Sequence, residues 1–154
     1  MRHRLSERIH VALPAEEAFR LFTPRGECEW AHGWNPAFPV PPDDDSEPGT
    51  VFQVDAHGQR GTWLVTDREW GRRIAYAQVV QDHRAGSVTV TLDAIEGGSE
   101  VEVVYELTPL SETGERYLER SPRTTATFCS PGKTRSRHVS RSELRSRNDG
   151  TANA

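Results

Sequence analysis

The sequence predicts an α+β fold: an antiparallel sheet of six or seven strands, two short N-terminal helices and a truncated or degraded C-terminal helix. Three observations support this class. Six segments have strand character, and the last two alternate strictly between apolar and polar residues. Helical segments with an apolar face directly follow the first strand. After the last strand, a new helical pattern begins but stops near residue 119.

A strand over residues 5–13 precedes a helix that begins at Pro14. Apolar residues alternate with charged or small ones along the strand, which is the period of a half-buried strand. Proline suits the first position of a helix, and two glutamates follow it in the first turn, where the helix dipole favours negative charge. Pro24 ends this helix. A short second helical segment is expected over residues 27–32.

Residues 33–49 contain five prolines and the acidic run Asp43-Asp44-Asp45, so we expect a loop with at most a short edge strand. From residue 50 the sequence changes to repeated strands separated by glycine-containing turns. These strands are expected over residues 50–55, 61–68, 73–81, 86–95 and 99–108. The alternation in the last two predicts a sheet with one apolar face and one solvated face.

The C-terminal segment begins as a helix and then loses its pattern. Ser111 is a suitable N-cap for a helix whose first turns cover residues 115–119. Of the 35 residues in 120–154, 19 are Ser, Thr, Lys or Arg. Such a segment buries too little apolar surface to offset its ordering entropy, so we expect a disordered tail. The formal charge is −10 for residues 1–119 and +6 for residues 120–154.

Two interpretations of the basic tail stay open. The abrupt end of the pattern, the reversal of charge and the helix-breaking Pro122 favour a shifted reading frame or a damaged C-terminus. The alternative is a real basic tail that binds an anionic partner or a membrane surface. Under the first interpretation the apolar face of the sheet lacks its cover, which would favour a homodimer. The uncovered residues would be Val88, Val90, Val101, Val103 and Tyr105.

Composition excludes several function classes. The acidic body gives no reason to expect nucleic-acid binding. No segment approaches the ~20 apolar residues of a membrane span, so integral membrane association is not expected. The N-terminus lacks the apolar segment of a signal peptide, and Cys28 and Cys129 lie too far apart to suggest a disulfide framework. We therefore expect a cytoplasmic protein.

Several stretches resemble the SRPBCC superfamily, which includes START, Bet v 1-like and polyketide-cyclase-like domains. The resemblance covers about residues 5–119 and implies a START-like helix-grip domain over residues 1–119, followed by the tail 120–154. In that fold a curved sheet grips a long C-terminal helix, and an apolar cavity lies between them. The stretches are residues 9–19, Gly33-Trp34-Asn35-Pro36, residues 48–52, Thr62-Trp63, Arg73-Ile74-Ala75-Tyr76, residues 86–95 and residues 105–111.

The resemblance implies binding or transport of a small hydrophobic ligand, with no cofactor. A polyketide cyclase or dehydratase acting in the same pocket is one alternative, and an Hsp90-activator-like interaction domain is another. An enzyme needs ionisable groups that converge in the cavity. The strand positions that face inward are almost purely apolar, which favours a carrier over an enzyme.

Large apolar side chains on the strands and the preceding loop are the candidate ligand contacts. Their alternative role is ordinary core packing, because pockets are lined by core-type residues. Trp34, in a loop that could act as a gate, and Trp63, whose N–H needs a partner, rank first. The candidates are Trp30, Trp34, Phe38, Phe52, Trp63, Tyr76, Val90, Val103 and Tyr105.

The candidate catalytic residues are His32, Tyr76 and Tyr105. His32 lies between two tryptophans and could act as a general base, or it could be an exposed loop residue. The two tyrosines could donate from within the pocket, but we favour hydroxyls placed at its rim. We expect no metal site, because the histidines are scattered and the acidic run lacks the spaced ligands of a calcium loop.

Overall fold

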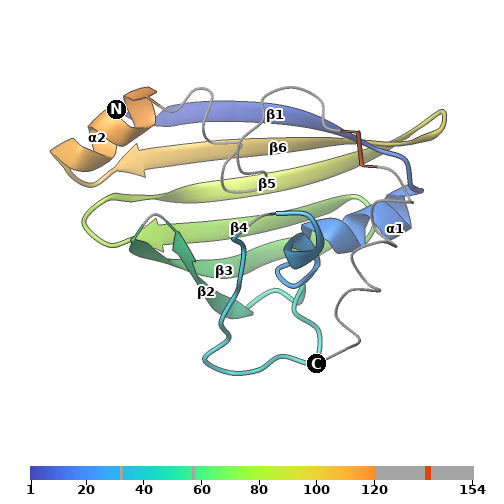
Figure 1. The fold of residues 1–154 in the computed structure, drawn as a ribbon, viewed down its shortest axis with the longest axis horizontal. Helices are drawn as coiled ribbons and strands as arrows, with labels where there is room; N and C mark the ends of the chain where they lie inside the picture. Colours follow the sequence, from blue (N-terminus) through green and yellow to red (C-terminus); the bar gives the residue numbers. More distant parts are fainter. Residues whose placement is uncertain (32, 57, 121–137, 140–154) are drawn as a thin grey trace.

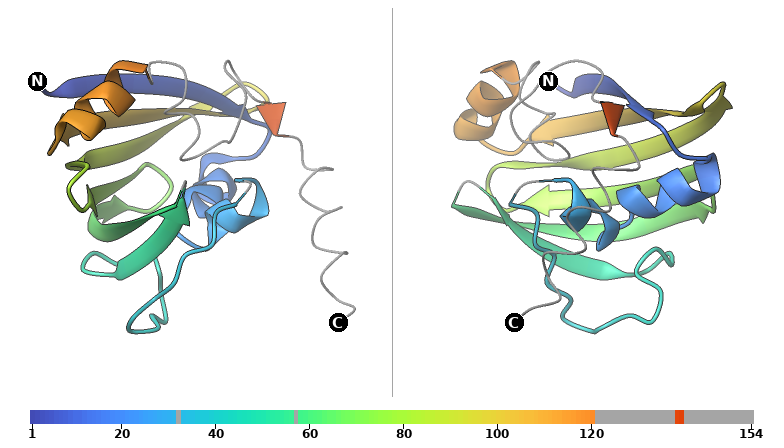
Figure 2. Two further views of the ribbon diagram at one scale, coloured as in Figure 1. Left: turned by 60° about the vertical axis from the view of Figure 1, so that its left-hand side comes forward. Right: turned by 45° about the vertical axis from the view of Figure 1, so that its right-hand side comes forward.

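The computed structural model describes residues 1–31, 33–56, 58–120 and 138–139. In this part of the chain the strands form one sheet with the order β2-β3-β4-β5-β6-β1-β7. The sheet is strongly curved (Figures 1 and 2). Neighbouring strands are antiparallel, except that β7 runs parallel to β1. The strands are β1 (His3–Val11), β2 (Val51–Ala56), β3 (Gln59–Glu69), β4 (Arg73–Val80), β5 (Arg84–Ile95), β6 (Gly98–Pro109) and β7 (His138–Val139).

The predicted strands are confirmed, with shifts at their ends. β1 begins at His3 because the alternation of Ile9 and Val11 continues back through Leu5, and every residue of β1 pairs with β6. The hairpin between β5 and β6 closes with Ile95 opposite Gly98. Gly97 lies between them at φ 82°, a backbone conformation that only glycine adopts without strain. The predicted edge strand in the proline-rich loop is reduced to one bridge between Ala37 and Gln53.

The N-terminal helical segment is shorter and tighter than predicted. α1 (Ala15–Phe19) continues as the 3-10 helix η1 (Arg20–Phe22), and a second 3-10 helix, η2 (Gly26–Glu29), follows. Pro14 is not the first helical residue but the N-cap, since its ψ of 152° is extended. Pro24 separates η1 from η2, as its place in the sequence predicts.

The face of the sheet toward α1, which we call the inner face, carries the core. Side chains from β1 to β6 on this face join Phe19, Leu21 and Phe22 in one apolar cluster. The expectation of an uncovered apolar face is wrong, since the five residues named for it are 0–1% exposed. Part of their cover comes from α1, which contacts β5 and β6, whereas the sequence suggested a C-terminal helix alone. A homodimer stays a prediction. The five residues are Val88, Val90, Val101, Val103 and Tyr105.

A C-terminal helix follows the last strand of the hairpin, as predicted. α2 (Glu112–Arg120) follows β6, whereas α1 follows the antiparallel β1, so the two helices lie at opposite ends of the sheet (Figure 1). Ser111 caps α2, because its Oγ accepts a hydrogen bond from the Gly114 N–H at 3.1 Å. Apart from β7, the basic tail from residue 121 onward lies outside the described residues, and with it the predictions about its disorder and origin.

Candidate functional site

Five of the nine predicted ligand contacts form one aromatic cluster. Trp63 and Phe52 stack nearly parallel at 5.8 Å between ring centroids, and Tyr76 meets both edge-on at 5.8 and 5.9 Å. Trp34 lies 5.6 Å from Trp63, and Phe38 lies 6.0 Å from Phe52. The cluster arises because β2, β3 and β4 are neighbours and these strand residues share the inner face. Trp34 and Phe38 reach it from the loop before β2 and are only partly buried.

Two tryptophans are fixed by hydrogen bonds to the helical segment. The indole Nε1 of Trp30 donates to the Leu21 carbonyl at 2.6 Å, and that of Trp34 donates to the Pro24 carbonyl at 2.7 Å. Trp30 packs on Phe22 rather than in the aromatic cluster. These bonds hold Trp30 and Trp34, and with Trp34 the loop proposed as a gate, against the N-terminal helical segment.

The tyrosines correct our expectation of rim hydroxyls. Tyr76 is 3% exposed and Tyr105 is 1% exposed, so both are buried in the core. The Tyr76 hydroxyl donates to the Phe22 carbonyl at 2.7 Å, which ties β4 to the end of η1. Both side chains point inward because they share a strand face with apolar neighbours, and burial then demands a partner for the hydroxyl. This makes Tyr76 a poor proton donor to a ligand.

The remaining predicted contacts lie farther along the inner face. Val90 on β5 is paired in register with Val103 on β6, and Tyr105 is paired with Val88. All are buried, but the structure does not place them in the aromatic cluster. His32 lies outside the described residues, so its proposed role stays a prediction.

Three polar side chains on the same face escaped the sequence analysis; Gln78 and Arg84 are buried, and Glu7 is partly buried. Gln78 is 1% exposed, and neither atom of its carboxamide has a hydrogen-bond partner among the described residues. Glu7 faces Val103 across the β1–β6 pair, and burial raises the pKa of its carboxyl. Arg84 is 3% exposed near the start of β5. The alternation of β4 could have identified Gln78, because Gln78 lies on the same strand face as Ile74, Tyr76 and Val80.

Arg84 belongs to a polar cluster where the sheet meets α2. Its guanidinium donates to Nδ1 of His83 at 2.8 Å and lies 4.7 Å above the ring of Tyr117. Because arginine only donates, that His83 nitrogen must be the unprotonated one. Burial, and then the charge of Arg84, lowers the pKa of His83, which agrees with a neutral imidazole. Burial also lowers the pKa of Arg84.

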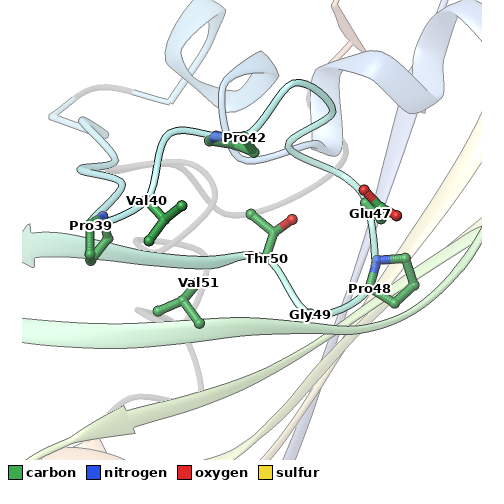
Figure 3. Close-up of a pocket in the computed structure, with 8 residues that line it drawn as sticks. All are labelled: Pro39, Val40, Pro42, Glu47, Pro48, Gly49, Thr50 and Val51. Atoms are coloured by element: carbon green, nitrogen blue, oxygen red, sulfur yellow. The ribbon is translucent and has the colours of Figure 1, made fainter.

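A groove of about 460 Å³ lies elsewhere, where the proline-rich loop crosses the start of β2 (Figure 3). None of the predicted ligand contacts lines it. The groove is lined by Pro39, Val40, Pro42, Glu47, Pro48, Gly49, Thr50 and Val51.

Within the described ranges no three His, Cys, Asp or Glu side chains gather in a way that could hold a metal ion. Cys28 is exposed and unpaired, and Cys129 lies outside those ranges. In the same part of the chain, no helix combines the length and apolar character that a membrane crossing requires.

The sequence matches the model of a family described as polyketide cyclase / dehydrase and lipid transport over residues 2–127. The match therefore extends past residue 119, where the strand and helix patterns end. No curated protein matches the sequence.

Solved structures share the fold at low identity. Protein MLL2253 from Mesorhizobium loti superposes with a TM-score of 0.64 and 16% identity, over 97% of this chain and 98% of its own. An uncharacterised protein from Rhizobium leguminosarum gives 0.61 and 15%, over 97% and 96%. Ara h 8.0201 gives 0.59 and 15%, over 83% of this chain and 93% of its own. At these identities the likeness concerns the fold alone.

Proposed function

This chain belongs to the polyketide cyclase / dehydrase and lipid transport family, and we propose that it binds a small hydrophobic molecule on the inner face of its sheet. The fold is a ligand-binding fold, and the family description includes lipid transport. The contacts we assign to the ligand centre on the aromatic cluster, with Val90, Val103 and Tyr105 extending the apolar surface.

The aromatic cluster is the observation that carries the proposal. Trp63 and Phe52 present stacked rings, and Trp34 closes over them from a loop rather than from the sheet. Aromatic side chains offer a large rigid apolar area, and partly buried rings at the edge of a core can exchange protein contacts for ligand contacts. Trp34 and Phe38 have this position, since both pack on the core while remaining partly exposed.

Calorimetric titration tests the proposal. We expect 2-acetonaphthone or lauric acid to bind the purified protein, and Trp34→Leu to weaken binding about tenfold, because it removes one aromatic wall. Trp70→Leu is the matched control, since Trp70 packs on Phe19 outside the cluster and is 51% exposed. Equal weakening by both variants, or no binding by the wild type, would contradict the proposal.

A second candidate function is cyclisation or dehydration of a polyketide-type substrate on the same inner face of the sheet. The observation that favours it is Glu7, an inward-facing carboxyl whose pKa burial raises, as a general acid requires. A synthetic poly-β-ketone offered to the protein should cyclise faster than in buffer, and Glu7→Gln should abolish the difference. Ligand binding without any such acceleration would leave the carrier function alone.

A further inference from the structure

The carboxamide of Gln78 is buried at the edge of the aromatic cluster without a partner among the residues that the structure describes. Its Nε2 and Oε1 both lack a hydrogen bond there, and the side chain is 1% exposed. A buried amide left unpaired destabilises a fold, and such groups are few in native proteins. A residue of this kind on a ligand-facing surface points to a group that arrives with the ligand.

Trp63, which carries an indole N–H, lies beside Gln78 in the sheet. The two residues are paired in register between β3 and β4, and both face inward. The indoles of Trp30 and Trp34 donate to backbone carbonyls, whereas no acceptor among the described residues meets Nε1 of Trp63. That nitrogen lies above Gly61, where an added Cβ would come within 3.3 Å of it.

The strand on the other side of Gln78 contributes no side chain. Gln78 is paired in register with Gly86 on β5. Position 86 must be glycine, because an added Cβ would lie 1.9 Å from the Glu106 carbonyl oxygen. Gln78 is thus paired with Trp63, which carries an indole N–H, on one neighbouring strand and with bare backbone on the other.

We propose that Gln78 and the Trp63 N–H form the polar end of the ligand site, and that the ligand is a neutral apolar molecule carrying a carbonyl next to an N–H or O–H donor. This inference rests on the proposed function. A carboxamide offers one acceptor and two donor hydrogens, so a carbonyl with an adjacent donor satisfies it on both sides. The Trp63 N–H supplies a further donor to the same carbonyl. A carboxylate would leave Oε1 of Gln78 without a donor.

Three naphthalene probes of one shape test the proposal by calorimetry. 2-Naphthamide carries the acceptor and the donor, 2-acetonaphthone carries the acceptor alone, and 2-naphthoate carries a charge and no donor. The wild type should bind the amide about 5- to 10-fold more tightly than the ketone, which is the size of one net hydrogen bond. Gln78→Met should remove this preference while leaving the ketone affinity within about twofold.

The matched control is Gln53→Met, which changes the same residue type on β2, where the side chain is only partly buried and bonds to Thr62. This variant should keep the preference for the amide. Gln78→Met should also raise the melting temperature of the ligand-free protein, because it removes unpaired buried polar atoms. A glutamine with a purely structural role would instead lower the melting temperature when replaced.

The outcomes separate this inference from the proposed function. If all three probes bind equally to the wild type and to Gln78→Met, the polar end is refuted while the hydrophobic site stands. Tighter binding of 2-naphthoate than of 2-naphthamide would also refute it, in favour of an anion site at Arg84. If no probe binds, both the inference and the proposed function fail.

Discussion

The hydroxyl of Tyr76 holds the N-terminal helical segment on the sheet, and its removal should have a measurable cost. The hydroxyl donates to the Phe22 carbonyl at 2.7 Å in a side chain that is 3% exposed. Tyr76→Phe keeps the ring and deletes the hydroxyl that makes this bond. Losing a buried hydrogen bond and leaving its acceptor behind costs about 1–3 kcal/mol.

Urea denaturation followed by far-UV circular dichroism measures this cost. With an m value of about 1.5 kcal/mol/M, a loss of about 1.5 kcal/mol lowers the midpoint by about 1 M. Tyr76→Leu should cost more, because it also removes the ring contacts with Phe52 and Trp63. A midpoint for Tyr76→Phe within about 0.2 M of the wild type would refute the account of how η1 is fixed.

Three further changes have directions set by the structure. Gly114→Ala should destabilise the protein by about 1–3 kcal/mol, since the new Cβ would lie 1.8 Å from the His83 carbonyl oxygen; the exposed Thr113→Ala should not. Burial raises the pKa of Glu7, so the stability of the fold decreases as the pH rises above the ordinary value of 4.5. Glu7→Gln should therefore stabilise the protein at about pH 7 but not at a pH below 4.5, as denaturation at the two pH values would show. The pKa of His83 is lowered, so the folded state loses stability as the pH falls below the ordinary value of 6.5. His83→Gln should reduce this loss, as melting temperatures measured across the same pH range would show.

Strand parity explains how much of the fold could be predicted. Val101 and Val103 on β6 alternate with glutamates, and the structure buries both at 0% exposure. The same parity placed Phe52, Trp63 and Tyr76 on one face, and the sheet order then brought them together. The helical elements were harder to predict, because a short segment with a proline at each end can form an α-helix, a 3-10 helix, or one followed by the other. α1 and η1 divide that segment between them.

The polar part of the site could not be predicted by searching for apolar pocket linings. Gln78 and Glu7 occupy inward positions of β4 and β1, but a single polar residue in an alternating strand does not show that its partner is missing. The missing partner can be recognised only when the positions of the neighbouring backbone and side chains are known. The buried state of Arg84 likewise depends on α2, whose Tyr117 ring packs against the guanidinium.

The indole signals of the four tryptophans test the central claim most directly. In ¹H–¹⁵N spectra of the protein titrated with 2-acetonaphthone, the Nε1–H signals of Trp34 and Trp63 should shift together, because both rings belong to the aromatic cluster. The signal of Trp70, which packs on Phe19 at 4.5 Å and is half-exposed, should stay in place. A shift of Trp70 alone, or four unchanged signals at saturating ligand, would contradict a ligand site on the inner face of the sheet.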